Sequence, residues 1–258
     1  MICIVMLVMF AATAGAAIQT LQVQNGLTVG GSTYSSTESL WMRSDGSGIN
    51  NAMLRVGYQT DSTGIKRSLI RFNYLDDKYH GVDVGFADYQ IVGARLILTT
   101  DTAFEGTGYC ELRVLDSTDE GWTEMYTTWN LKRTDLSQSW VGGPGVGTNY
   151  GDVLDTVRWI NPGGNAGPTL TPLTFDITGA GIDVIKNWVS GNDTSASFIL
   201  KADVESGSTS NYVDFYSEAF NTTPGYRPML EIDYDLTIIP EPATMIILCL
   251  GGLLIRRK

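Results

Sequence analysis

The chain of 258 residues has one histidine and three cysteines, and 17 basic residues face 28 acidic ones. The scarcity of histidine excludes a His-rich metal site and any Ser/His or Cys/His catalytic pair that does not use His80. A formal net charge of −11 argues against binding to nucleic acid or an anionic membrane, because phosphate binding requires a basic face. The sequence also lacks a P-loop, a G-x-S-x-G turn and an H-E-x-x-H zinc motif.

The composition that is present favours a folded β protein. Hydrophobic residues make up 43% of the chain and charged residues 17%, which is enough apolar surface to form a core. Short alternating apolar runs, separated by Gly, Asn, Asp and Ser clusters, are typical of an antiparallel sandwich with one buried and one wet face per sheet. The clearest strand candidates are residues 68–74, 90–99, 109–115, 173–176, 197–202, 213–217 and 229–234.

Two segments depart from this strand pattern. Residues 179–189 place Ile182, Ile185 and Trp188 on one helical face, which predicts one short amphipathic helix ending before Gly191. Residues 137–172 are rich in Gly and Pro and long for a loop, which predicts a functional or mobile connection.

The N-terminus has the pattern of a targeting segment. Residues 2–12 are apolar and uncharged, and small residues follow at 13–17. This run has the length of a signal-peptide hydrophobic region and falls short of the roughly 20 residues that a spanning helix needs. It predicts a signal peptide over residues 1–17, although no basic residue precedes it; a buried N-terminal strand is the alternative.

The C-terminus combines a proline motif, an apolar run and a basic cluster, formed by Pro240, Glu241 and Pro242, by residues 243–255, and by Arg256, Arg257 and Lys258. This order resembles the PEP-CTERM sorting signal of Gram-negative bacteria, here assigned to residues 237–258. The resemblance implies export, transient membrane insertion through a C-terminal hydrophobic helix, and cleavage by an exosortase-type enzyme. It implies delivery to the cell surface or extracellular matrix, with a permanent tail anchor as the alternative.

Loss of both end segments removes Cys3 and Cys249 and leaves Cys110 as the one cysteine of the mature chain. An intramolecular disulfide is therefore not expected. Because Cys110 lies in a strand-like stretch, it is predicted to be a small core residue rather than a reactive thiol.

A second set of motifs follows a fixed order along the chain: K-R-S-L-I-R-F at 66–72, G-W-T-E and T-W-N within 121–130, F-D-I-T at 175–178, W-V-S-G at 188–191, F-Y-S at 215–217 and R-P-M-L at 227–230. This order resembles DNRLRE-type domains, a group related to bacterial carbohydrate-binding modules, and assigns residues 18–236 to one domain. The resemblance implies an all-β, antiparallel β-sandwich of jelly-roll type, without catalytic residues. The chain departs from it at Ser217-Glu218, where an intervening Arg is absent, and in the long 137–172 segment, so no ligand site is carried over.

Sugar binding depends on aromatic rings that stack on the C–H face of a pyranose while polar neighbours bind its hydroxyl groups. The candidate platforms in loop-like or strand-edge positions are Trp41, Tyr126, Trp140, Tyr150 and Trp159. Three further tryptophans, Trp122, Trp129 and Trp188, belong to the family blocks and are predicted to pack in the core.

Five arginines on the strand-like segments are open to two interpretations: Arg43, Arg55, Arg71, Arg95 and Arg113. On one sheet face they would form a basic patch for a polyanionic chain such as alginate. Alternatively, they are ion-paired scaffolding.

Calcium is the metal that the acidic loops favour, because carboxylate and carbonyl oxygens suit this hard cation. The candidate ligands are Asp116, Asp119 and Glu120, with Asp203 and Glu205 as a second group. No D-x-D-x-D-G loop occurs, so solvated acids without a structural calcium are the alternative.

Together these patterns predict an exported, non-catalytic protein of the cell surface or biofilm matrix that binds polysaccharide. The alternatives are a polysaccharide lyase or hydrolase on the same scaffold and a purely structural exoprotein. His80 lies in a polar loop with no orienting carboxylate assigned to it, so it is predicted to be a loop residue rather than a general base.

Overall fold

The computed structural model describes residues 18–29, 32–49, 52–61, 63–73, 87–101, 105–160 and 170–236. The predicted signal peptide, His80 and the predicted C-terminal sorting signal lie outside these residues. Within the described ranges, no helix is both long and apolar enough to cross a membrane.

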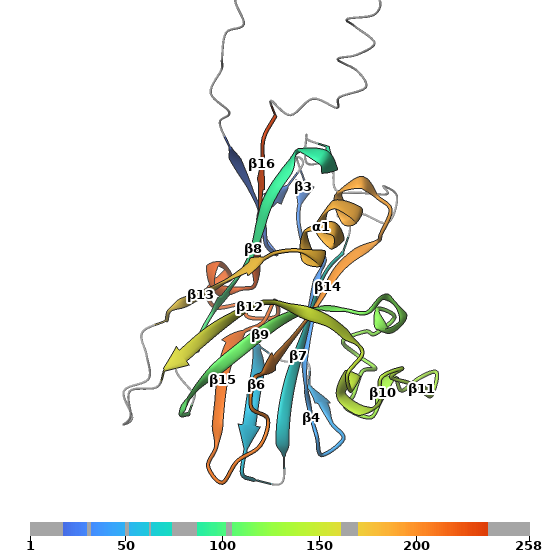
Figure 1. The fold of residues 1–258 in the computed structure, drawn as a ribbon, viewed down its shortest axis with the longest axis vertical. Helices are drawn as coiled ribbons and strands as arrows, with labels where there is room; N and C mark the ends of the chain where they lie inside the picture. Colours follow the sequence, from blue (N-terminus) through green and yellow to red (C-terminus); the bar gives the residue numbers. More distant parts are fainter. Residues whose placement is uncertain are drawn as a thin grey trace, which may run out of the picture.

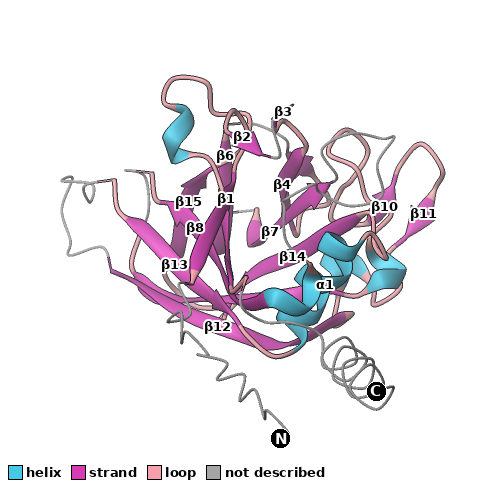
Figure 2. Cartoon of the chain, turned by 90° about the horizontal axis from the view of Figure 1, so that it is seen from above, coloured by secondary structure: helices cyan, strands magenta, loops and turns pink. Residues whose placement is uncertain are grey.

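Two curled antiparallel sheets form the body of the protein (Figures 1 and 2). The larger sheet has the order β12-β9-β14-β7-β4-β5, from Tyr150–Ile160, Thr107–Leu115, Ser195–Ala202, Gly64–Asn73, Thr37–Arg43 and Gly48–Ile49. The smaller sheet has the order β1-β16-β8-β13, from Gln19–Val23, Met229–Tyr234, Ile91–Thr99 and Pro172–Ile177. Both consist of antiparallel pairs, as the alternating sequence pattern predicts.

Two further strands, β6 (Met53–Gln59) and β15 (Asn211–Tyr216), belong to the larger sheet and extend it toward the smaller one. β6 pairs with both β7 and β15. A bridge between Thr100 and Phe215 then joins β15 to the end of β8. A further short pair, β2 (Thr28–Val29) and β3 (Ser32–Thr33), follows β1.

The main core lies between the two sheets, because alternate residues of each strand point inward. Ile70 and Phe72 of β7 and Leu96 of β8 are fully buried there. The predicted helix is present as α1 (Ala180–Ser190), and its Trp188 joins the same core. α1 ends at Gly191, whose φ of 78° lies in the left-handed region that glycine favours at a helix end.

The outer face of the larger sheet carries a second apolar cluster. Leu69 of β7 and Ile199 of β14 point away from the main core and pack with Trp122, Trp129 and Trp140. These tryptophans belong to residues 116–149, which we call the cap. The expectation of one wet face per sheet is therefore wrong for the larger sheet, because the cap covers part of it.

The cap is mostly irregular. It contains two 3-10 turns, η2 (Ser117–Asp119) and η3 (Pro144–Val146), and the short hairpin of β10 (Leu131–Arg133) and β11 (Gln138–Ser139). Outside the cap, two more 3-10 turns precede β8 and β16: η1 (Asp88–Gln90) and η4 (Pro224–Tyr226).

Arg67 of β7 attaches one part of the cap to the sheet. Its Nη1 donates to the carbonyl oxygens of Gly145 and Gly147, at 2.7 and 2.9 Å. Its Nη2 lies 2.7 Å from the carboxylate of Glu205. Since the guanidinium is nearly buried, these contacts are shielded from water and serve as structural links.

Arg71 lies further along β7 on the same face of the sheet, and it attaches the other part of the cap. Its Nη1 donates to the carbonyl oxygen of Glu120 at 2.7 Å, and its Nη2 pairs with Glu38. The guanidinium carbon lies 4.6 Å from the centroid of the Trp122 ring, a cation–π contact. The two arginines of the K-R-S-L-I-R-F motif thus stabilise the cap.

Replacing Arg67 with methionine is expected to lower the free energy of unfolding by about 3 kcal/mol, because Glu205 and two cap carbonyls lose their donor. Urea unfolding followed by tryptophan fluorescence measures this change. The matched control is Arg133→Met, which removes an exposed pair with Asp135 in the same cap and should leave the midpoint unchanged. An unchanged midpoint for Arg67→Met would show that the cap does not depend on this arginine.

All seven predicted strand segments are strands in the structure: β7, β8, β9, β13, β14, β15 and β16. The predicted loop over residues 137–172 is wrong in its middle, where the 11-residue β12 lies. Among the described strands β12 pairs with β9 alone, and Trp159 is its single fully buried side chain. Because only one side chain of this edge strand is buried, its sequence shows only a weak alternation of apolar and polar residues.

Candidate functional site

Three of the five predicted aromatic platforms are buried. Trp41, Trp140 and Trp159 are 6%, 4% and 2% exposed. Trp159 is part of the main core, while Trp140 packs beneath the cap and donates from Nε1 to the carbonyl oxygen of Thr128 at 3.0 Å. Burial removes the open ring face that stacking on a sugar requires.

The other two predicted platforms, Tyr126 and Tyr150, have cationic neighbours. Tyr126 is 38% exposed on the cap, with the guanidinium of Arg133 5.7 Å from its ring centroid. Tyr150 is partly exposed, with the guanidinium groups of Arg113 and Arg67 at 5.0 and 5.9 Å. The ring of Tyr126 is therefore accessible to a ligand, whereas the ring of Tyr150 is in contact with two guanidinium groups.

The predicted calcium ligands Asp116 and Asp119 have hydrogen-bond donors at their oxygens. Asp116 caps η2 by accepting the Thr118 N–H at 2.9 Å. Asp119 is fully buried and accepts from the Val141 N–H at 3.1 Å and from Asn149 Nδ2 at 2.7 Å.

A lysine supplies the positive charge beside Asp119. Lys132 Nζ lies 3.5 Å from Asp119 Oδ1 and donates to the carbonyl oxygen of Thr118 at 2.6 Å, and both charged side chains are buried. The contacts of Asp119 do not include Glu120, the third predicted ligand. Burial is the main cause that raises the pKa of Glu120 to about 7. Among the described residues, no three acidic, histidine or cysteine side chains converge on a common point. The second candidate group is also engaged, since Glu205 pairs with Arg67 and Asp203 accepts the Tyr109 N–H.

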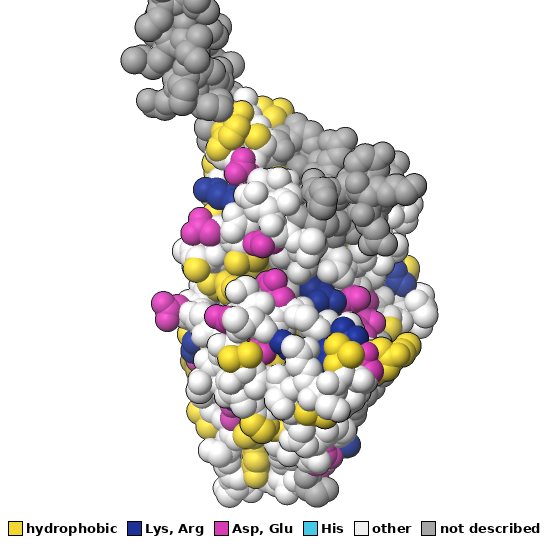
Figure 3. Space-filling view, turned by 90° about the vertical axis from the view of Figure 1, so that its right-hand side faces the viewer, with side chains coloured by type: hydrophobic (Ala, Val, Ile, Leu, Met, Phe, Trp, Pro, Cys, Tyr) yellow, Lys and Arg dark blue, Asp and Glu magenta, His cyan; other side chains and the backbone are white. Residues whose placement is uncertain are grey.

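Each of the five arginines considered as a basic patch has an acidic partner: Arg43 with Asp45, Arg55 with Asp214, Arg71 with Glu38, Arg95 with Glu231 and Asp233, and Arg113 with Glu111. Figure 3 shows the same pattern on one face, where basic side chains lie next to acidic ones. This pairing favours the scaffolding interpretation over a patch for polyanions.

Two carboxyl groups meet at the edge of β4. The Ser39 N–H donates to Glu124 Oε1 at 2.7 Å, and the Ser39 hydroxyl donates to Glu218. The carboxyl groups of Glu124 and Glu218 are hydrogen-bonded to each other. Burial and the adjacent Glu124 raise the pKa of Glu218 to about 8, so one proton is shared by the pair at neutral pH.

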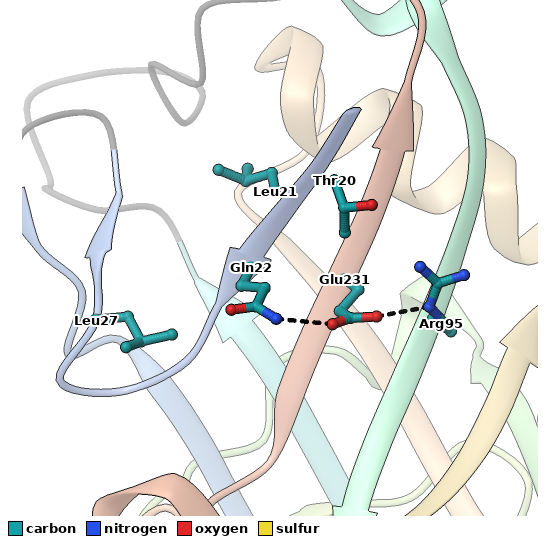
Figure 4. Close-up of a pocket in the computed structure, with 6 residues that line it drawn as sticks. All are labelled: Thr20, Leu21, Gln22, Leu27, Arg95 and Glu231. Atoms are coloured by element: carbon teal, nitrogen blue, oxygen red, sulfur yellow. Dashed lines mark hydrogen bonds and ion pairs between the residues drawn. The ribbon is translucent and has the colours of Figure 1, made fainter. Parts of the chain in front are cut away.

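A polar groove lies on the open side of the smaller sheet (Figure 4). Its volume is about 410 Å³, and it is lined by Thr20, Leu21, Gln22, Leu27, Arg95 and Glu231. These residues come from β1, β16, β8 and the turn after β1. Among these strands, β1 is at the edge of the sheet.

Hydrogen bonds across three strands fix the polar side chains of the groove. Gln22 Nε2 donates to Glu231 Oε1 at 2.9 Å, and Arg95 Nε donates to Glu231 Oε2 at 2.6 Å. Arg95 also pairs with Asp233 at 3.0 Å, and the Thr20 hydroxyl donates to the same carboxylate at 2.6 Å. Figure 4 shows Gln22, Glu231 and Arg95 in one row. The groove therefore presents planar polar groups in a fixed arrangement.

Sequence reasoning did not find this groove, although a signal was present. Glu231 and Asp233 alternate with the buried Leu230 and Ile232 in β16, so their outward position follows from the strand pattern. What the sequence does not contain is the register that brings Gln22 and Arg95 to opposite sides of Glu231. No protein-family model matches this chain, and no curated protein matches it in sequence.

Proposed function

We propose that this protein is an exported, non-catalytic component of the cell surface or extracellular matrix that binds polysaccharide in the groove on β1, β16 and β8. The observation that supports this most directly is the row of Gln22, Glu231 and Arg95, held in place by mutual hydrogen bonds. Amide, carboxylate and guanidinium groups bind sugar hydroxyls well, and fixed side chains lose little entropy on binding.

The finer features of the sequence belong to the same proposal. The two sheets are arranged as a jelly roll of the DNRLRE type, preceded by a signal peptide over residues 1–17 and followed by a PEP-CTERM signal over residues 237–258. An exosortase-type enzyme recognises Pro240, Glu241 and Pro242 and releases the domain outside a Gram-negative cell. The ordering of the proline motif, apolar run and basic tail supports this route.

The carboxyl pair at Glu124 and Glu218 does not favour the hydrolase alternative. Glycosidase carboxyl groups flank the scissile bond and are about 5 to 9.5 Å apart, whereas these two are in direct hydrogen-bond contact. A sugar ring does not fit between two groups that share a proton. We place binding in the groove first because its polar side chains are held in a fixed row.

Native gel electrophoresis through gels containing soluble polysaccharide tests this proposal, with hydroxyethylcellulose, xylan, galactomannan, dextran and alginate as the panel. At least one gel should retard the protein. Arg95→Met should weaken that binding by at least tenfold, because Glu231 and Asp233 lose the cation that holds them in position. The matched control is Arg158→Met, an exposed arginine on β12 of the other sheet, which should bind like the wild type. The proposal is overturned if no gel in the panel retards the wild-type protein.

A further inference from the structure

Three aromatic rings that are not among the predicted platforms, those of Tyr216, Phe220 and Tyr226, form a cluster at η4. The ring centroids of Tyr216 and Phe220 are 4.1 Å apart, and that of Tyr226 lies 5.5 Å from Tyr216 and 6.4 Å from Phe220. The planes of Phe220 and Tyr226 are within 16° of parallel. Tyr216 is buried and forms the base of the cluster, whereas Phe220 and Tyr226 are partly exposed.

One arginine links the segment of this cluster to the turn beside the groove. Arg227 Nε donates to the carbonyl oxygen of Phe220 at 2.8 Å, and its Nη1 donates to the carbonyl oxygen of Asn25 at 3.0 Å. In the same turn, Gln24 Nε2 donates a hydrogen bond to the carbonyl oxygen of Arg227 at 2.6 Å. The turn that contains Asn25 also provides Leu27, which lines the groove. The aromatic cluster and the groove are thus fixed to the same turn.

Polar groups lie directly beside the rings. The Tyr216 hydroxyl donates to Asp101 Oδ1 at 2.8 Å, and Arg227 Nη2 donates to Asn221 Oδ1 at 3.0 Å. A carboxylate and an amide next to parallel rings provide the two parts that a pyranose needs: an apolar surface for its C–H face and partners for its hydroxyl groups.

We propose that Tyr216, Phe220 and Tyr226 form a stacking subsite that continues the groove, and that the ligand of this combined surface is a neutral polysaccharide. This inference rests on the proposed function and adds to it both a second subsite and a substrate class. One chain would contact the polar row at Glu231 and place a sugar ring on the aromatic cluster before the start of β16.

The charges on this surface determine the substrate class. In the groove one cation, Arg95, faces two carboxylates, Glu231 and Asp233, while at the rings the carboxylate of Asp101 is balanced by the guanidinium of Arg227. The whole chain has a formal net charge of −11. A uronic-acid polymer would be repelled at the groove, where carboxylates outnumber the cation, whereas a neutral chain would meet no such penalty.

Affinity gels with hydroxyethylcellulose, galactomannan and alginate test the subsite through substitutions of the partly exposed Tyr226. Tyr226→Leu keeps an apolar side chain but removes the flat ring, and it should weaken binding to the neutral gel by about tenfold. Tyr226→Phe keeps the ring and should bind like the wild type. Phe220→Leu should act like Tyr226→Leu, while Tyr109→Leu, which changes an exposed tyrosine on β9 of the other sheet, should have no effect.

The possible outcomes separate this inference from the proposed function. Retardation of the wild type by a neutral gel that Arg95→Met weakens, with Tyr226→Leu and Phe220→Leu unchanged, would overturn the stacking subsite and leave groove binding intact. Stronger retardation by alginate than by either neutral gel would overturn the neutral substrate class. No retardation of the wild type by any gel would overturn both. Thermal unfolding of each variant confirms that a loss of affinity is not a loss of fold.

Discussion

The variant Asp119→Ala is expected to lose about 3–5 kcal/mol of its free energy of unfolding, the largest effect of a single substitution that we expect in the cap. Asp119 is fully buried, and its removal leaves the ammonium group of Lys132 in the interior with no carboxylate beside it. The Val141 N–H and the Asn149 amide lose their acceptor at the same time. Urea unfolding with tryptophan fluorescence measures the loss, because Trp122, Trp129 and Trp140 are buried beneath the same cap that contains this pair.

Two controls identify the buried charge as the cause. Asp135→Ala removes a carboxylate of an exposed ion pair in the same cap and should leave the midpoint unchanged. The double variant Asp119→Leu with Lys132→Met removes both charges and should recover part of the lost stability, because no unpaired ion is left inside. The chelator EGTA should leave the wild-type midpoint unchanged. A midpoint that EGTA lowers in the wild type but not in Asp119→Ala would instead place calcium at this carboxylate.

A strand was predictable from the sequence where every second side chain is buried in the main core. The helix was predictable because one of its faces is buried there. β7, β8 and β14 have this pattern because both their edges are paired and their inner faces contact the other sheet. Cys110 follows the same rule, and it is fully buried in β9 as predicted. β12 was missed because it is an edge strand with one buried side chain, between Gly- and Pro-rich segments.

The candidate site was less predictable, because its residues come together only through tertiary contacts. Trp140 and Trp159 lie in polar, Gly-rich sequence and were predicted as platforms, but the cap and the edge of the larger sheet bury them. Phe220 and Tyr226 lie in an equally polar segment, and only their contact with Tyr216 brings them together. Local composition indicates that such rings are outside a strand; it does not indicate which of them the fold leaves exposed.

The protein is expected to be more stable at pH 5 than at pH 8.5, because a buried carboxyl group holds a proton in the folded state. The pKa of Glu218 is raised from 4.5 to about 8 by burial first and by the neighbouring Glu124 second. The folded state therefore binds this proton more tightly than the unfolded state does. The resulting stabilisation is complete below pH 4.5 and is lost as the pH rises through 8; at about 1.4 kcal/mol per pKa unit, the shift of Glu218 corresponds to roughly 5 kcal/mol over this window.

Glu218→Gln tests this assignment, since glutamine resembles the protonated carboxyl group and keeps a donor toward Glu124 and an acceptor for Ser39. Its free energy of unfolding should match that of the wild type near pH 5 and exceed it at pH 8.5. Glu120→Gln is the comparison, because burial raises the pKa of Glu120 to about 7 and its contribution should disappear at lower pH than that of Glu218. Thermal unfolding of the three proteins between pH 5 and 9 separates the two contributions. A Glu218→Gln variant with the same pH profile as the wild type would place the shared proton elsewhere.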